Sequence, residues 1–197
     1  MLRTTPPSRP TSNEPIECPH ADRCAGCPAI GLDAAAQAAR KSARVAAAIA
    51  RHGELARVER APLIEAEWVE GYRVRAKLAV SGAALGLYAR GTHDVVDIPA
   101  CPVLAPGLRA AAEQLRAWLR ASPRAREVLA VDLREAATAQ GPRGIVTLIV
   151  DEAAPRPPAH ALDALALALE RAGVATLALA RRARPSPQLL GHSLEVV

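Results

Sequence analysis

The fold is decided by a run of short alternating segments, YRVRAKLAVSGAALGLYARGTHDVVDI, which spans residues 72–98. Charged and apolar residues alternate over residues 72–80, and this period of two is typical of a half-exposed β-strand. Ser81-Gly82 and Gly91-Thr92 then mark turns between further strand-like segments. The sequence therefore predicts a meander of hairpins over residues 54–105.

The segment before the meander has a different composition. Residues 1–15 are polar and rich in proline, which predicts a disordered tail. Residues 16–53 begin with a loop dense in Cys, Pro and Gly and continue into an alanine-rich stretch. Asp33 is a plausible helix N-cap and Gly53 a plausible helix end, so we expect a helix between them.

The second half of the chain, residues 106–184, predicts an α-β-β-α-β order. The expected helices and strands are 106–122, 128–134, 145–150, 161–172 and 174–180, with a turn at 141–144. Such an order favours an α+β layer with helices packed on an antiparallel sheet. Residues 185–197 are interpreted as a linker.

Composition and charge exclude several classes of protein. Half of the chain is apolar but only 2% is aromatic, which argues against a platform of rings that stack on bases. The net charge is +5, and all basic residues except Lys41 and Lys77 are arginines, a mild indication of a polyanionic partner. No segment is apolar enough to span a membrane or to serve as a secretion signal, so we expect a cytoplasmic protein in a reducing compartment.

The four cysteines form the most specific pattern in the chain. Cys18, Cys24 and Cys27 have the spacing C-x5-C-x2-C, and Cys101 is remote in sequence. Four thiolates suit a four-iron, four-sulfur cluster, whereas structural zinc more often uses two close pairs. His20 would be available to a zinc site, or is a solvated loop residue. A set of four reduced, buried cysteines without metal remains the third reading.

The first segment of the meander is also basic. Because a strand has a period of two, Arg73, Arg75 and Lys77 share one face, where a phosphate backbone would relieve their mutual repulsion. The alternative is an ordinary solvated sheet face. Further candidate contacts to RNA lie on the predicted basic helix, at Arg40, Lys41 and Arg44.

The sequence contains no complete active site. No glycine-rich strand-to-helix turn, P-loop, zinc-protease motif or nucleophile elbow is present. Four carboxylates have no identifiable catalytic partner in the sequence: Asp94, Asp97, Asp132 and Glu135. We therefore predict no catalytic residue and no cofactor-binding glycine.

Three stretches carry a resemblance to a known family: CPHADRCAGCPAIGLDAAAQAARKSARVAAAIARHG (18–53), GYRVRAKLAV (71–80) and GLYARGTHDVVDIPACPVLAP (86–106). They resemble the class I, S-adenosylmethionine-dependent RNA (uracil-5-)-methyltransferases, in particular those that modify 23S ribosomal RNA and carry a four-iron, four-sulfur cluster. The resemblance implies that Cys18, Cys24, Cys27 and Cys101 hold the cluster and that the α+β part faces RNA. In the family a cysteine attacks C6 of the uracil and a carboxylate later removes the C5 proton.

Two departures from the family shape the expectation. Many members begin with a small RNA-binding barrel, whereas only 17 residues precede Cys18. The family's Rossmann-like catalytic domain, which binds S-adenosylmethionine, would begin after residue 197. We therefore expect the cluster-bearing, RNA-binding front part of a uracil-5 methyltransferase, inactive alone, with ribosomal RNA favoured over transfer RNA and no membrane or protein partner implied. The alternative is a stand-alone zinc or iron–sulfur module that binds nucleic acid without catalysis.

Overall fold

The computed structural model describes residues 14–64, 66, 69–155, 158–183 and 193–197. The chain divides into two compact units rather than the three folded segments expected from the sequence. Unit 1 comprises Met1–Cys18 and Cys27–Val69, and unit 2 comprises Pro19–Gly26 and Glu70–Val197. Most of the predicted disordered tail, residues 1–13, lies outside the described residues. No helix in the described ranges is long and apolar enough to cross a membrane.

Unit 1 contains helix α1 (Ala34–Ile49) and the short 3-10 helix η1 (Gly53–Leu55). The predicted cap is confirmed, because Asp33 Oδ1 accepts a hydrogen bond from the Ala36 amide at 2.7 Å. The predicted end at Gly53 is wrong, since the helix stops after Ile49 and Gly53 begins the 3-10 helix. No residue of α1 is buried.

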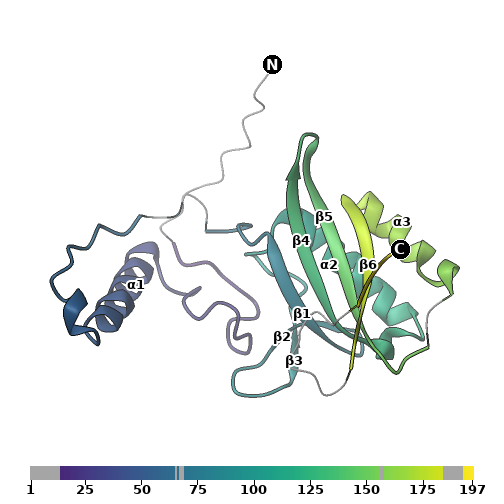
Figure 1. The fold of residues 1–197 in the computed structure, drawn as a ribbon, viewed down its shortest axis with the longest axis horizontal. Coiled ribbons are helices and arrows are strands. Elements are labelled where there is room, and N and C mark those ends of the chain that lie inside the picture. Colours follow the sequence, from purple (N-terminus) through teal and green to yellow (C-terminus); the bar gives the residue numbers. More distant parts are fainter. Residues whose placement is uncertain (1–13, 65, 67–68, 156–157, 184–192) are drawn as a thin grey trace. The chain divides into compact units, whose positions relative to one another are not determined.

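Unit 2 is built on one sheet, whose strand order is β3-β2-β1-β4-β5-β6-β7 (Figure 1). The strands are β1 (Arg75–Ser81), β2 (Ala84–Tyr88), β3 (Val95–Asp97), β4 (Val128–Thr138), β5 (Gly141–Asp151), β6 (Val174–Arg182) and β7 (Ser193–Val196). The predicted hairpin meander is present as β1–β3. It is not a separate domain, because β1 pairs with β4 and continues directly into the second half of the chain.

The sheet is mixed rather than antiparallel. Strands β5 and β6 run parallel, joined by a crossover that contains α3 (Asp163–Arg171), while every other neighbouring pair is antiparallel. The predicted linker is also corrected, because strand β7 within it pairs with β6. The rest of that linker, residues 185–192, lies outside the described residues. The α+β class is confirmed.

The hairpin between β4 and β5 is longer than the sequence predicted. Strand β4 extends to Thr138 and β5 begins at Gly141, so the turn falls at residues 139–140 and not at 141–144. Gly141 has a φ of 107°, and Pro142 pairs with Ala137 next to the turn. A proline is tolerated there because β5 pairs with β6 only from Gly144 onward, so Pro142 lies at an edge of the sheet.

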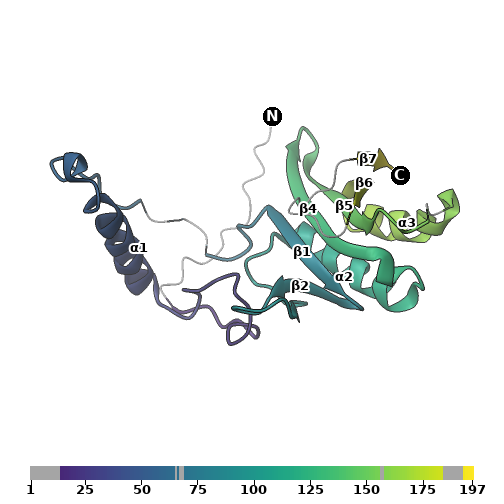
Figure 2. The same cartoon turned by 60° about the horizontal axis from the view of Figure 1, so that its bottom comes forward.

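Helices α2 (Pro106–Ala121) and α3 lie against one face of the sheet (Figures 1 and 2). Short 3-10 helices η2 (Ala125–Glu127) and η3 (Ala159–Leu162) follow α2 and precede α3. The apolar stripe of α2 and the inward side chains of the strands form the core, which includes Leu78, Leu85, Leu108, Leu115, Val131, Leu133, Leu148 and Leu165. Helix α2 was predicted almost to the residue, since Pro106 is its first position and its leucines recur at helical spacing.

Candidate functional site

The basic strand places two of its three predicted cations on the sheet face opposite the helices. Arg75 and Lys77 alternate along β1 with Ala76 and Leu78, which are buried in the core. The side chain of Arg75 is 48% exposed. The strand therefore has one apolar and one cationic face, as its period of two predicts.

Arg73 has a different environment from the other two. It precedes β1 and forms an isolated parallel bridge with Leu104. Its Nη2 donates a hydrogen bond of 3.3 Å to the carbonyl of Gly26 in the cysteine loop. Val74 is half exposed, so the alternation of burial begins only at Arg75. Arg73 thus connects the basic strand to the cysteine loop instead of extending the open cationic face.

The neighbouring strand β4 adds two charged residues that the sequence analysis did not assign to this site. Asp132 pairs with Lys77 across the ladder, and Arg134 pairs with Arg75. Asp132 Oδ2 lies 2.6 Å from Arg134 Nε, and its Oδ1 lies 3.4 Å from Arg75 Nε. The signal was present in the segment VDLRE, where Asp132 and Arg134 share a strand face, but the pairing of β1 with β4 was needed to bring them to Arg75.

The part of the cysteine loop that belongs to unit 2 packs on strand β2 and its extension. Cys24 forms an antiparallel bridge with Ala89, and its Sγ lies 3.4 Å from the Gly26 amide, which donates to it. A Cβ atom on Gly26 would lie 2.6 Å from Leu87 Cδ1, so any other residue here would require the Leu87 side chain to shift. Gly26 does not have a positive φ, so the constraint at this position is close packing and not a left-handed backbone.

None of the four cysteines forms a disulfide, and they divide between the two units. Cys18 and Cys27 belong to unit 1, and Cys24 and Cys101 belong to unit 2. Cys101 is buried, next to a segment that pairs with the start of the basic strand through the Arg73 amide and the Val103 carbonyl at 2.8 Å. Within the described ranges, no three His, Cys, Asp or Glu side chains form a group suited to a metal ion. Ligation of a cluster by these four cysteines stays a prediction.

His20 lies in the same loop, beside a buried ion pair. Arg116 of α2 is 3% exposed, and it donates from Nε to Asp97 Oδ1 at 2.7 Å and from Nη2 to the Leu85 carbonyl at 2.8 Å. Burial lowers the pKa of His20; Asp97 opposes this shift and Arg116 adds to it. The Nε2 atom of His20 is buried without a partner in the described part of the chain, although the residue as a whole is only half-buried.

No residue of the predicted basic helix α1 is buried. Arg40 Nη1 donates to the Pro28 carbonyl at 2.9 Å, which joins the helix to the loop before it. Lys41 and Arg44 are exposed. These three cations therefore stay candidates for contacts to a polyanion.

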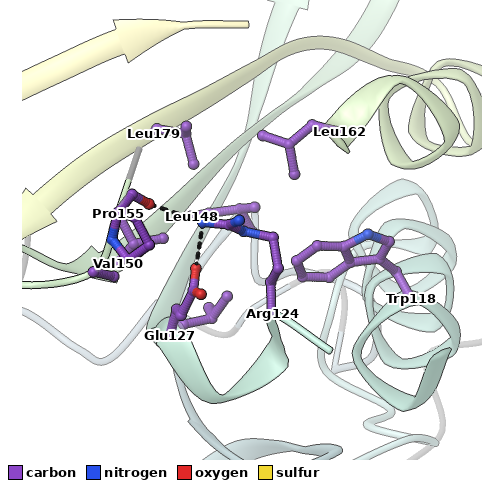
Figure 3. A pocket seen from close by; sticks show the side chains of 10 residues that line it. Trp118, Arg124, Glu127, Leu148, Val150, Pro155, Leu162 and Leu179 are labelled. Atoms are coloured by element: carbon purple, nitrogen blue, oxygen red, sulfur yellow. Dashed lines mark hydrogen bonds and ion pairs between the residues drawn. The ribbon is translucent and has the colours of Figure 1, made fainter. Parts of the chain in front are cut away.

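A small apolar pocket lies elsewhere in unit 2, between α2, β5 and β6 (Figure 3). Trp118 and aliphatic side chains line it, and an ion pair of 2.8 Å between Arg124 and Glu127 closes one side. Arg124 Nη2 also donates to the Pro155 carbonyl at 2.8 Å. None of the predicted site residues lines this pocket, and its lining offers no nucleophile or base beyond the paired Glu127.

The fold resembles that of a solved methyltransferase. The tRNA (uracil-54, C5)-methyltransferase of Pyrococcus abyssi, solved with S-adenosyl-L-homocysteine, matches 87% of this chain and 40% of its own chain with a TM-score of 0.57. The two sequences are 17% identical, so the likeness establishes the fold alone. No protein-family model matches the chain.

Curated relatives are more similar in sequence. The 23S rRNA (uracil(1939)-C(5))-methyltransferase RlmD of Pectobacterium carotovorum is 36% identical over 110 residues, which cover 51% of this chain and 23% of the relative. That of Halomonas elongata is 32% identical over 138 residues, or 68% of this chain and 27% of the relative. The chain thus spans about a quarter of the length of the relatives it matches. The resemblance to RNA uracil-5 methyltransferases that the sequence predicted is confirmed.

Proposed function

We propose that this chain is the RNA-binding, iron–sulfur part of an enzyme that methylates C5 of uridine in RNA. The observation that carries the proposal is the open cationic face of β1, with Arg75 and Lys77 standing opposite a helix-covered core. Such a face suits a phosphate backbone, which is read through charge and largely without regard to sequence. The names of the relatives, which specify 23S rRNA, favour ribosomal RNA as the substrate.

The cluster would be held by Cys18, Cys24, Cys27 and Cys101. The donor set fits, because the chain has four cysteines, none of them forms a disulfide, and the Sγ of Cys24 already accepts a backbone N–H. Four thiolates are the ligand set of a four-iron cluster, and amide donors to sulfur stabilise its charge. When bound, the cluster supplies a cross-link between residues far apart in the sequence, and loading would therefore be coupled to folding.

Methyl transfer itself is assigned to residues outside this chain. C5 of uracil is a poor nucleophile until C6 carries a covalent adduct, and that adduct needs a thiolate beside the base. If all four cysteines hold the cluster, none is available as this nucleophile. Residues 1–197 should then bind RNA and yield no detectable 5-methyluridine with a radioactive methyl donor. Robust labelling by this chain alone would contradict the division of labour proposed here.

The metal content is tested on protein purified without oxygen. About four irons and four sulfides per chain are expected, as one cubane on four thiolates requires. Cys101→Ser should lose iron, sulfide and solubility together. One equivalent of zinc without sulfide would overturn the cluster assignment and favour a zinc-bearing module.

The RNA contact is tested by the salt dependence of binding to a single-stranded RNA. Replacing Arg75 and Lys77 together by Gln should flatten the slope of log affinity against log salt by about 1.4, because each phosphate contact to a single strand contributes about 0.7. Arg120→Gln, on the exposed side of the last turn of α2, is the matched control and should leave the slope unchanged. An unaltered slope in the double variant would return β1 to the reading of a solvated sheet face.

A further inference from the structure

The open face of unit 2 contains a buried carboxylate among cations, which the proposed function does not explain. Asp132 is 2% exposed, whereas its partners Arg75 and Arg134 are 48% and 42% exposed. Burying a carboxylate is costly unless charged donors satisfy it. In a surface meant only to attract a polyanion, a negative charge at its centre would be a disadvantage. The presence of Asp132 at this position therefore calls for a structural reason.

The geometry supplies this reason. Arg75 and Arg134 are direct neighbours across the β1–β4 ladder, and Asp132 lies on the same face, opposite Lys77. Side chains in such a cross-strand pair stand about 5 Å apart at Cβ. Asp132 accepts from the Nε of each arginine, one carboxylate oxygen to each. Without this carboxylate the two guanidinium groups would repel each other and separate.

The contacts through Nε leave the outer edges of the guanidinium groups available. In the described part of the chain, the hydrogen bonds of the Arg75 and Arg134 side chains are made through Nε, and their Nη atoms form none. Each Nη pair carries donors in a planar fork, which matches two oxygens of a phosphate. Three cations on this face outnumber one carboxylate: Arg75, Lys77 and Arg134 compared with Asp132. The resulting excess of positive charge suits an anionic ligand.

We propose that Asp132 positions Arg75 and Arg134 as a paired guanidinium clamp for one phosphodiester of the RNA backbone. This inference rests on the proposed function, which supplies RNA as the ligand. It adds Arg134 as a binding residue and Asp132 as a positioning residue that does not touch the RNA. It also separates the roles of the basic strand: Arg75 is part of the clamp, Lys77 adds charge beside it, and Arg73 belongs to the cysteine loop.

The sign of one mutational effect tests the clamp. Asp132→Asn adds one positive charge to the face, so simple electrostatics predicts tighter binding of a single-stranded oligouridylate. The clamp predicts the opposite, a loss of about tenfold, because the two guanidinium groups are no longer held together. In the background of Arg75→Gln and Arg134→Gln, the same substitution should no longer weaken binding and should tighten it. Asp163→Asn, an exposed carboxylate on α3, is the charge-matched control and should not weaken binding.

Each result of Asp132→Asn in these two backgrounds either supports or contradicts the clamp. Tighter binding by Asp132→Asn in both backgrounds overturns the clamp and leaves a diffuse cationic face. Weaker binding in both backgrounds, with a lowered melting temperature, makes Asp132 a purely structural residue. If the wild-type chain shows no salt-dependent binding of the oligouridylate, the proposed function itself fails, and this result is distinct from the other two.

Charge-conserving variants test the clamp if Asp132→Asn does not fold. Arg75→Lys and Arg134→Lys keep every charge but remove the Nε and the planar fork, and both sites are about half exposed. Binding should fall about tenfold for the pair while the salt slope stays the same. Unchanged affinity would overturn the clamp. Inorganic phosphate is the final control, and displacement of the RNA by low millimolar phosphate but not by sulfate would make this a free-phosphate site instead.

Discussion

Helices α1 and α2 have the same length and similar alanine-rich sequences, yet they are stabilised in opposite ways. Helix α1 has a side-chain cap at Asp33 and no buried residue. Helix α2 has no side-chain cap and buries six residues: Leu108, Ala111, Ala112, Leu115, Arg116 and Leu119. Local hydrogen bonding thus defines the start of α1, whereas α2 depends on packing against the sheet.

The difference shows where the chain concentrates its stability. A helix without buried residues gains only from propensity, capping and local pairs, which together are worth little more than the cost of nucleation. A helix with an apolar stripe in the core shares in the cooperative stability of the whole unit. Amide hydrogen exchange should therefore be fast along α1 and close to the global unfolding limit in α2.

The largest loss of stability is expected from a substitution on the buried side of α2. Leu115→Ala removes a fully buried side chain and should destabilise unit 2 by about 2–5 kcal/mol. Val45→Ala in α1, where the side chain is 53% exposed, should change stability by less than about 0.5 kcal/mol. Urea unfolding followed by Trp118 fluorescence and by circular dichroism measures both. Equal effects at the two positions would mean that α1 is buried in solution.

A smaller loss is expected for the buried arginine of α2. Arg116→Met keeps much of the side-chain volume but leaves the Leu85 carbonyl without its donor and Asp97 without its cation. The cost should be about 1–3 kcal/mol, limited because Asp97 is 32% exposed and partly solvated. Arg120→Met, one turn later on the exposed side, is the control and should be nearly neutral. If Arg116→Met leaves the free energy of unfolding unchanged, the Arg116–Asp97 pair contributes only to conformational specificity.

The smallest effect is the one at the cap of α1. Asp33→Ala removes the acceptor of the Ala36 amide and should cost about 1 kcal/mol of local helix stability. Exchange of the first amides of α1 should accelerate, while α2 and the strands keep their protection. Asp33→Ser retains a capping oxygen and should restore most of the protection. Slower or unchanged exchange in Asp33→Ala would contradict a locally stabilised helix.

Most of the secondary structure could be predicted because it depends on local patterns. The period of two in residues 72–80 predicted β1, and the leucine spacing with Pro106 predicted α2. The turn glycines Gly82 and Gly91 lie where expected and have positive φ. The errors fall where the outcome depends on pairing: the length of the β4–β5 hairpin and the strand β7 within a supposed linker. How far a strand extends depends on the partner that supplies its hydrogen bonds, and the local sequence does not specify that partner.

The candidate site likewise combines features that the sequence shows with contacts that only the fold supplies. The cysteines, the basic strand and the resemblance to uracil-5 methyltransferases were all visible in the sequence, because residue type and spacing carry that information. Asp97 and Asp132 were noticed as carboxylates without partners, and the fold supplied Arg116 to the first and two arginines to the second.

The sequence by itself determined the chemistry available to this protein: free thiols in place of aromatic platforms, arginine in place of lysine, and strands with one cationic face. Only the tertiary structure decided which of these groups meet. Pairing of β1 with β4 brought Asp132 between Arg75 and Arg134, and the turn of the cysteine loop took Arg73 out of the open face. The physical reason is that residue type is a local property, whereas a contact across a sheet depends on register, which the whole buried face must fix.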